Sequence, residues 1–183
     1  MTIMPNNTLV ASSKLFKTKA PWRINGSLLG QITKDHDVIL FDHDSSKTTY
    51  EQMSKKIGKY LYHRLQREIQ HLTFIGYEHE CRLVSDLYVT MGYKFDSAIL
   101  INNIHDESVY QPVLGHTAIF NFWTKDEQPH GPIQGAEENV YVKTLMPAHM
   151  SNRLAQEVSG CLIYGWYNQN SLENNKPVFN YVG

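Results

Sequence analysis

The stretch from residue 72 to residue 87 has the sequence Leu72-Thr-Phe-Ile-Gly-Tyr-Glu-His-Glu-Cys-Arg-Leu-Val-Ser-Asp-Leu87, and it is the most informative part of the chain. Its first six residues are mostly apolar, as in a strand buried on both faces of a sheet. From Cys81 to Met91 the apolar residues recur at helical spacing. Gly92 is the expected end of that helix, because glycine enters the left-handed conformation without steric penalty. The stretch therefore predicts a strand, a sharp turn at Glu78 and an amphipathic helix.

Apolar strands and amphipathic helices alternate in the rest of the chain as well. A short apolar run at residues 38–41 predicts a strand, and helical periodicity predicts a long helix from Tyr50 to about Gln70. A capping box at its start pairs either Thr48 with Glu51 or Thr49 with Gln52. Further strands are predicted at residues 95–101, 117–123 and 140–145, and a last helix begins at about Ser151.

This alternation predicts an α/β fold with a mostly parallel, doubly wound sheet that is covered by helices on both faces. The chain has too few strand–helix units for an eight-fold barrel. With 183 residues it fits a single domain, residues 1–183. The ends, about residues 1–13 and 168–183, are expected to be loose tails.

Composition excludes several classes of function. The chain is 42% hydrophobic, and its 17 basic residues nearly balance its 18 acidic ones. A net charge of −1 provides no electrostatic footprint for nucleic acid or for an anionic membrane. No apolar stretch approaches the roughly 20 residues needed to span a bilayer, and we expect no signal peptide. Two cysteines make no disulfide framework. We therefore expect a soluble, cytoplasmic protein without a cofactor.

Polar residues follow each predicted strand. In a doubly wound sheet, ligands bind outside the carboxyl ends of the strands. The segments 42–44, 78–80, 102–103 and 126–127 are therefore expected to lie along one rim of the sheet.

Residues 72–102 also resemble a known family. They contain in order a strand, a Gly-Tyr-x-x-x-Cys turn, a Leu-Val-x-x-Leu helix, Met-Gly-Tyr, and Phe-Asp-Ser-Ala-Ile-Leu-Ile. From about Lys14 to Tyr164 the chain resembles small thioesterases of the α/β-hydrolase fold, in particular those that release or edit acyl and peptidyl chains on carrier proteins in nonribosomal peptide and polyketide assembly. Such enzymes carry their nucleophile within Gly-x-Ser-x-Gly at this turn. Here Glu78 stands in place of the serine and Glu80 in place of the second glycine.

The resemblance implies a site in which the catalytic triad is degenerate. Asn102 occupies the position of the acid, and His149 in Met-Pro-Ala-His-Met fits that of the histidine. Asp126 either replaces the missing acid or belongs to a solvated turn, which we favour. One oxyanion donor would be the backbone N–H of His79, and the other would come from residues 18–22. The lid, at about residues 104–115, would be short or absent.

Glu78 allows more than one interpretation. The favoured one is a thioesterase-like protein without hydrolytic chemistry, a pseudoenzyme that binds or assists an acyl or peptidyl carrier protein or another protein. The alternative is an enzyme of altered chemistry, a hydrolase, lyase or isomerase, in which Glu78 acts as base or nucleophile together with His149. A third interpretation treats Glu78 and Glu80 as a good helix start, because the helix dipole favours acidic residues there.

Two further constellations are weaker. Asp42-His-Asp44 and Glu78-His-Glu80 lie on neighbouring strand ends and carry oxygen and imidazole groups suited to a metal, but they match no established ligand spacing. We therefore predict no metal site. Cys81 lies near the turn as a possible displaced nucleophile, but its place in the first helical turn favours a packing role.

Overall fold

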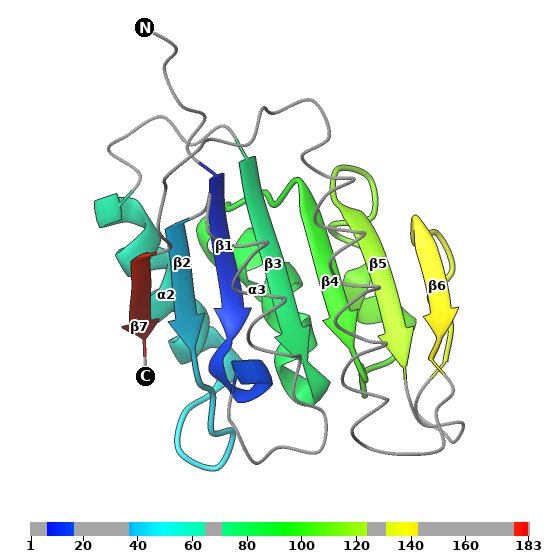
Figure 1. Ribbon diagram of the computed structural model, residues 1–183, viewed down its shortest axis with the longest axis horizontal. Helices are drawn as coiled ribbons and strands as arrows, with labels where there is room; N and C mark the ends of the chain where they lie inside the picture. The colour runs from blue at the N-terminus through cyan, green and yellow to red at the C-terminus, as the bar shows by residue number, and fades with distance from the viewer. Residues whose placement is uncertain (1–6, 17–36, 65–70, 124–130, 143–177, 183) are drawn as a thin grey trace, which may run out of the picture.

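A computed structural model of the chain describes residues 7–16, 37–64, 71–123, 131–142 and 178–182 (Figure 1). Its elements in chain order are β1 (Asn7–Ser12), η1 (Ser13–Phe16), β2 (Asp37–Phe41), α2 (Tyr50–Arg64), β3 (His71–Tyr77), η2 (Glu78–Arg82), α3 (Leu83–Met91), β4 (Ser97–Ile101), η3 (Glu107–Tyr110), β5 (Ala118–Trp123), β6 (Glu138–Tyr141) and β7 (Val178–Val182).

The seven strands form one sheet in the order β6-β5-β4-β3-β1-β2-β7, and every neighbouring pair is parallel. From β1 the chain first moves outward to β2, and it then crosses back to β3 on the other side of β1. The order therefore reverses between β1 and β3, as in a doubly wound sheet. This confirms the predicted α/β class.

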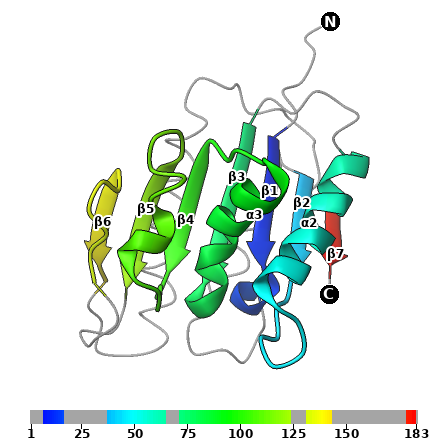
Figure 2. The same cartoon turned by 180° about the vertical axis from the view of Figure 1, so that it is seen from behind.

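The two described α-helices pack on the same face of the sheet (Figure 2). Met53, Ile57 and Leu61 of α2 and Leu83, Val84 and Leu87 of α3 are fully or almost fully buried with the sheet residues Val10, Ile39, Phe41 and Phe74. Side chains on the other face of the sheet, among them Leu9, Ala11, Ile75, Ile99 and Phe122, are buried as well. The strands β2 to β5 are thus buried on both sides, which explains why they are mostly apolar without alternation.

The start of α2 and the end of α3 have the capping residues that the sequence predicts. Thr49 and Gln52 form the capping box of α2: the Gln52 amide donates to Thr49 Oγ1 over 3.1 Å, and the Thr49 amide donates to Gln52 Oε1 over 2.9 Å. Of the two predicted pairings, the structure selects this one. Gly92 ends α3 with φ 75°, as predicted.

The structure departs from the predictions at the two ends of the chain. The expectation of loose tails is wrong for residues 7–13 and 178–182, because β1 lies in the middle of the sheet and β7 pairs with β2. The predicted helix at residues 81–91 begins with the 3-10 turn η2, and the fifth predicted strand lies earlier, at Glu138–Tyr141. The helix predicted from Ser151 lies outside the described residues. No helix in the described part of the chain is long and apolar enough to cross a membrane.

Candidate functional site

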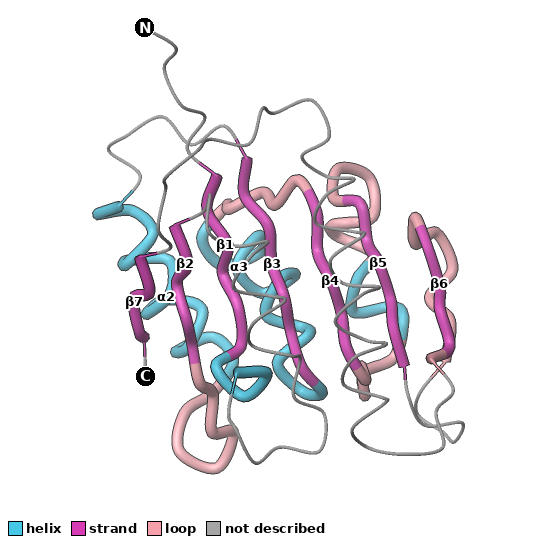
Figure 3. The backbone as a smooth tube through the Cα atoms, viewed as in Figure 1, coloured by secondary structure: helices cyan, strands magenta, loops and turns pink. Residues whose placement is uncertain are grey.

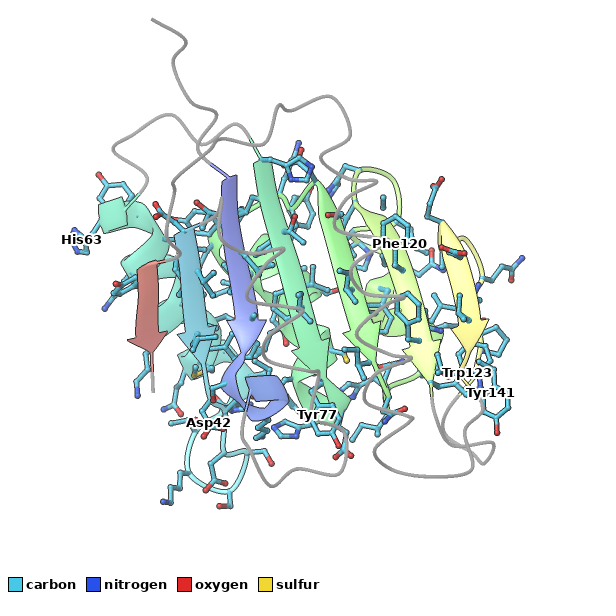
Figure 4. The ribbon with its side chains drawn as sticks, viewed as in Figure 1. Asp42, His63, Tyr77, Phe120, Trp123 and Tyr141 are labelled. Carbon is cyan, nitrogen blue, oxygen red and sulfur yellow. The ribbon has the colours of Figure 1, made fainter. Side chains whose placement is uncertain are left out.

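The carboxyl ends of the strands lie along one rim of the sheet (lower edge in Figures 1 and 3). Strand register pairs Ser12 with Phe41 and Tyr77 with Ile101, so the residues that follow these strands begin at similar heights. Asp42 and Tyr77 both lie at this rim in Figure 4. The predicted gathering of the segments after β2, β3 and β4 is therefore confirmed.

The turn after β3 is tight and strained at its apex. Glu78 has φ 51°, in the left-handed region that a residue with a Cβ rarely occupies, at a penalty of roughly 1–2 kcal/mol. Gly76 allows the close approach of the returning chain: a Cβ built on it would lie 2.7 Å from Phe74 Cε1 and 2.8 Å from the Cα of Cys81. The sharp turn predicted at Glu78 is therefore present, and its apex is strained.

Behind this turn, Glu80 is fully buried and ties three strands together. Its Oε1 accepts a hydrogen bond from Ser12 Oγ at 2.5 Å, at the end of β1. Its Oε2 accepts the backbone N–H of His43 at 3.0 Å, after β2, and lies 3.6 Å from Lys14 Nζ. Burial raises the pKa of the Glu80 carboxyl above its usual value, while the bonds from Ser12 and His43 and the charge of Lys14 act in the opposite direction. Glu80 is thus a structural anchor of the rim.

Three histidines form a second set of contacts across the same loops. His105 Nε2 donates to the backbone oxygen of His79 over 2.8 Å, and His79 Nε2 donates to the backbone oxygen of His43 over 3.0 Å. His43 Nε2 in turn donates to the backbone oxygen of Thr48 over 2.9 Å. Because a carbonyl oxygen only accepts, each ring carries its hydrogen on Nε2 when neutral. We call this series His105–His79–His43 the histidine ladder.

Tyr50, the first residue of α2, lies against all three rings of the ladder. Its ring centroid is 5.1 Å from that of His43, 6.3 Å from that of His79 and 5.8 Å from that of His105. The Arg82 guanidinium lies 4.3 Å from the Tyr50 centroid and is held there by two hydrogen bonds to Asp86. This places a cation on the aromatic face. The rim therefore carries a compact group of imidazole, phenol and guanidinium side chains.

The loop after β4 positions His105. Asn103, which is buried, accepts hydrogen bonds from the Tyr110 hydroxyl and the His105 amide, and it donates to the His105 oxygen. Asn102 is fully buried and has φ 53°, a conformation that asparagine tolerates better than most residues. Its backbone N–H donates to the backbone oxygen of Phe122 over 2.8 Å. The segment 104–115, predicted as a short lid, consists of η3 and successive turns.

Cys81 packs inside the protein, as the sequence favoured. It is fully buried, its Sγ contacts the Ile101 oxygen at 3.7 Å, and burial raises the pKa of the thiol well above its usual value. A neutral, buried thiol is a poor nucleophile. Burial likewise raises the pKa of the Tyr77 phenol, with the adjacent Glu78 carboxylate acting in the same direction.

The structure brings together only part of the predicted site. Glu78, His79 and Asn102 lie at the rim, whereas His149, Asp126 and residues 18–22 lie outside the described residues. His79 contributes its ring and its backbone oxygen to the ladder. Sequence reasoning missed the roles of Ser12, Lys14, Tyr50 and His105. His105 had a usable signal, since it closely follows a strand. Ser12 is the last residue of a strand that was not predicted, and Lys14 follows that strand.

The segments 42–44 and 78–80, which were considered as metal ligands, contact each other through a hydrogen bond and a ring contact. The amide of His43 binds Glu80, and the rings of His43 and His79 lie 5.3 Å apart between centroids. Among the described residues, no group of three or more histidine, cysteine, aspartate or glutamate side chains is arranged to hold a metal ion.

No protein-family model matches this chain, and no curated protein matches it either.

We predict that Glu78→Gly raises the free energy of unfolding by about 1 kcal/mol, because glycine accepts a positive φ without strain. The melting temperature is expected to rise by about 2–4 °C, measured by calorimetry. Glu78→Ala is the matched variant, since it removes the same carboxylate but keeps the strain, and it is expected to gain nothing. Equal gains in both variants would contradict strain as the cause.

Proposed function

We propose that this protein is a thioesterase-like, α/β-hydrolase-like protein that has lost hydrolytic chemistry and acts as a binding or accessory protein. The observation that carries the proposal is the turn at Glu78. It has the strained backbone and the close glycine contact suited to presenting a side chain at the sheet rim, but it presents a carboxylate. A carboxylate is a weak nucleophile toward a thioester, and the mixed anhydride that it would form lies higher in free energy than the thioester, whereas a serine activated by a base gives a lower-energy acyl ester.

The buried Glu80 supports the same proposal. Acyl transfer needs hydrogen-bond donors that stabilise an oxyanion next to the nucleophile. Here a second carboxylate, two residues beyond Glu78, occupies the interior behind the turn and takes the hydrogen bonds of Ser12 and the His43 amide. These two donors are therefore engaged by Glu80 and do not face a developing oxyanion. The site is therefore better suited to holding a conformation of the rim than to acyl transfer.

The proposed partner is an acyl or peptidyl carrier protein, by resemblance of the segment 72–102 to carrier-dependent thioesterases. We expect the purified protein to react with no serine-directed fluorophosphonate probe and to leave acyl thioesters of N-acetylcysteamine intact, while an acyl-loaded carrier protein binds measurably in calorimetric titration. Hydrolysis above background that Glu78→Gln abolishes would overturn the proposal. A purified catalytic thioesterase is the positive control for both reagents.

One observation favours a second candidate function, an enzyme in which the Glu78 carboxylate is a base or a nucleophile. Backbone strain of this kind concentrates at active sites, where the surrounding structure enforces it. In this case Glu78 works together with His149, and Glu78→Gln removes the activity without changing the fold. Turnover of a carbonyl or ester substrate that is sensitive to Glu78→Gln and not to Glu137→Gln would favour this second candidate over the first.

A further inference from the structure

His43 occupies an unusual position within the histidine ladder. Its side chain has no solvent exposure, and its Nε2–H is donated to the Thr48 oxygen. The other ring nitrogen, Nδ1, is buried without a hydrogen-bond partner in the described structure. In the neutral ring this atom is only an unused acceptor. In the protonated ring it would be a charged donor with no acceptor, and a buried unpaired charge is strongly unfavourable.

The groups around His43 do not supply that acceptor. Tyr50 and His79 contact its ring, at centroid distances of 5.1 and 5.3 Å. Lys14 Nζ donates to its backbone oxygen at 3.1 Å and adds positive charge, while Arg82 lies beyond Tyr50. The nearby anions are engaged elsewhere: Glu80 binds Ser12, Lys14 and the His43 amide, Asp42 lies 3.7 Å from Lys14 Nζ, and Asp44 binds Ser46.

We propose that His43 is a proton-operated latch: the loop formed by residues 42–49 stays closed while the His43 ring is neutral and opens when Nδ1 takes up a proton. Opening frees Nδ1 to donate to water. The backbone oxygen of His43 also holds the His79 ring, so the turn that carries Glu78 and His79 loosens with it. The latch depends on the geometry of this rim and not on the function proposed above.

The other two ladder histidines act in the same direction. Burial lowers the pKa of His79, and the charge of Lys14 adds to this effect. Burial also lowers the pKa of His105, with Arg82 contributing. A histidine with a lowered folded-state pKa contributes stability that is present above the unfolded value of 6.5 and is lost as the pH falls through the lowered value. Acidification therefore weakens the whole ladder.

The size of the expected effect follows from linkage. If only the open loop accepts the proton, the opening equilibrium increases by about tenfold between pH 7.5 and pH 5.5, the range in which solvent-exposed imidazole rings take up a proton. Hydrogen–deuterium exchange with mass spectrometry measures this opening after correction for the pH dependence of intrinsic exchange. We expect protection of residues 42–50 to fall about tenfold over this range, and that of β3 and β4 to stay unchanged.

Three variants test whether His43 is the sensor. His43→Gln keeps an N–H for the Thr48 oxygen but does not titrate, so it should lose the pH response. His63→Gln alters an exposed histidine far from Asp42 and the rim (Figure 4) and should keep it. Glu80→Gln should also keep it. An unchanged exchange rate in the wild-type loop, a full response in His43→Gln, or a response lost in Glu80→Gln would each overturn the latch.

A measurement on the unmodified chain covers the case in which His43→Gln does not fold. Nitrogen-15 NMR of the histidine rings should show His43 in the Nε2–H form at neutral pH, with its protonation accompanied by faster exchange in residues 42–50. Protonation of the His43 ring with no change in loop exchange would show that the closed loop tolerates the charge, and the latch would be wrong.

Discussion

Replacing Glu80 by alanine is expected to lower the free energy of unfolding by about 2–4 kcal/mol. The substitution leaves the buried Ser12 hydroxyl and the His43 amide without their acceptor, and each such group costs about 1–3 kcal/mol. It also leaves a cavity at a fully buried position. Burial of the Glu80 carboxylate is unfavourable, which is why its pKa is raised. Alanine removes this unfavourable burial, and the gain offsets part of the loss in the free energy of unfolding. Urea denaturation measures the difference.

Two further variants make this result specific. Glu80→Gln preserves volume and one acceptor oxygen, so its loss should be smaller than that of Glu80→Ala. Glu137→Ala removes an exposed carboxylate and should stay within about 0.5 kcal/mol of the wild type. If Glu80→Ala lost less than about 1 kcal/mol, the hydrogen bonds to Ser12 and His43 would not anchor the rim, and the structural role assigned to Glu80 would fail.

Replacing Gly76 by alanine is expected to lower the free energy of unfolding by about 3 kcal/mol, at the upper end of the range for overpacking. The new methyl group would lie 2.8 Å from the Cα of Cys81, which is a backbone atom within η2 and cannot rotate away. The Phe74 ring, at 2.7 Å, packs between Phe41 and Phe95 and has little room to move. Relief therefore requires a shift of β3 relative to the turn.

Gly115→Ala is the matched control for this prediction. A Cβ at Gly115 meets no atom within 4 Å, so that variant should be neutral or slightly stabilising. Thermal melting compares the two variants directly, and the Gly76→Ala protein should unfold several degrees lower. Equal melting temperatures would mean that the turn is not tightly packed against β3, which would weaken the comparison of this turn with the nucleophile turn of hydrolases.

Together these predictions separate two properties of the turn. The Gly76→Ala variant tests whether packing enforces the shape of the turn. The Glu78→Gly variant tests whether the backbone at the apex of the turn is strained. Under the proposed function, we expect the turn to have kept its tight packing and its strain although it no longer carries a catalytic group. Binding of a carrier protein without thioester cleavage would fit that state.

Much of the fold was predictable because its signals are local. The strands β2 to β5 are apolar runs bounded by polar residues, and the helical repeat of α2 and α3 lies within single segments. The capping box at Thr49 and the left-handed Gly92 involve residues at most five positions apart. The position of the turn at Glu78 followed from the change of periodicity between β3 and α3.

The strands β1 and β7 show where local signals end. The apolar run of β1 is only Leu9-Val-Ala11, between polar residues, and it becomes a central strand because β2 and β3 pair with it on both sides. β7 lies more than 130 residues from its partner β2 in the chain. Such pairing depends on the whole sheet, so short segments at the ends of the chain gave no reason to expect it.

By itself, the sequence determined the α/β class, the order of the central elements and the presence of a carboxylate at the apex of the turn after β3. Only the tertiary structure decided what surrounds that carboxylate. Glu80 binds Ser12, which lies 68 positions away in the chain, and His43, which lies 37 positions away. In the histidine ladder, the two bonds between histidines span 26 and 36 positions of the chain. Hydrogen bonds over such separations exist only once the parallel strands have brought their carboxyl ends to one rim, and no local pattern encodes them.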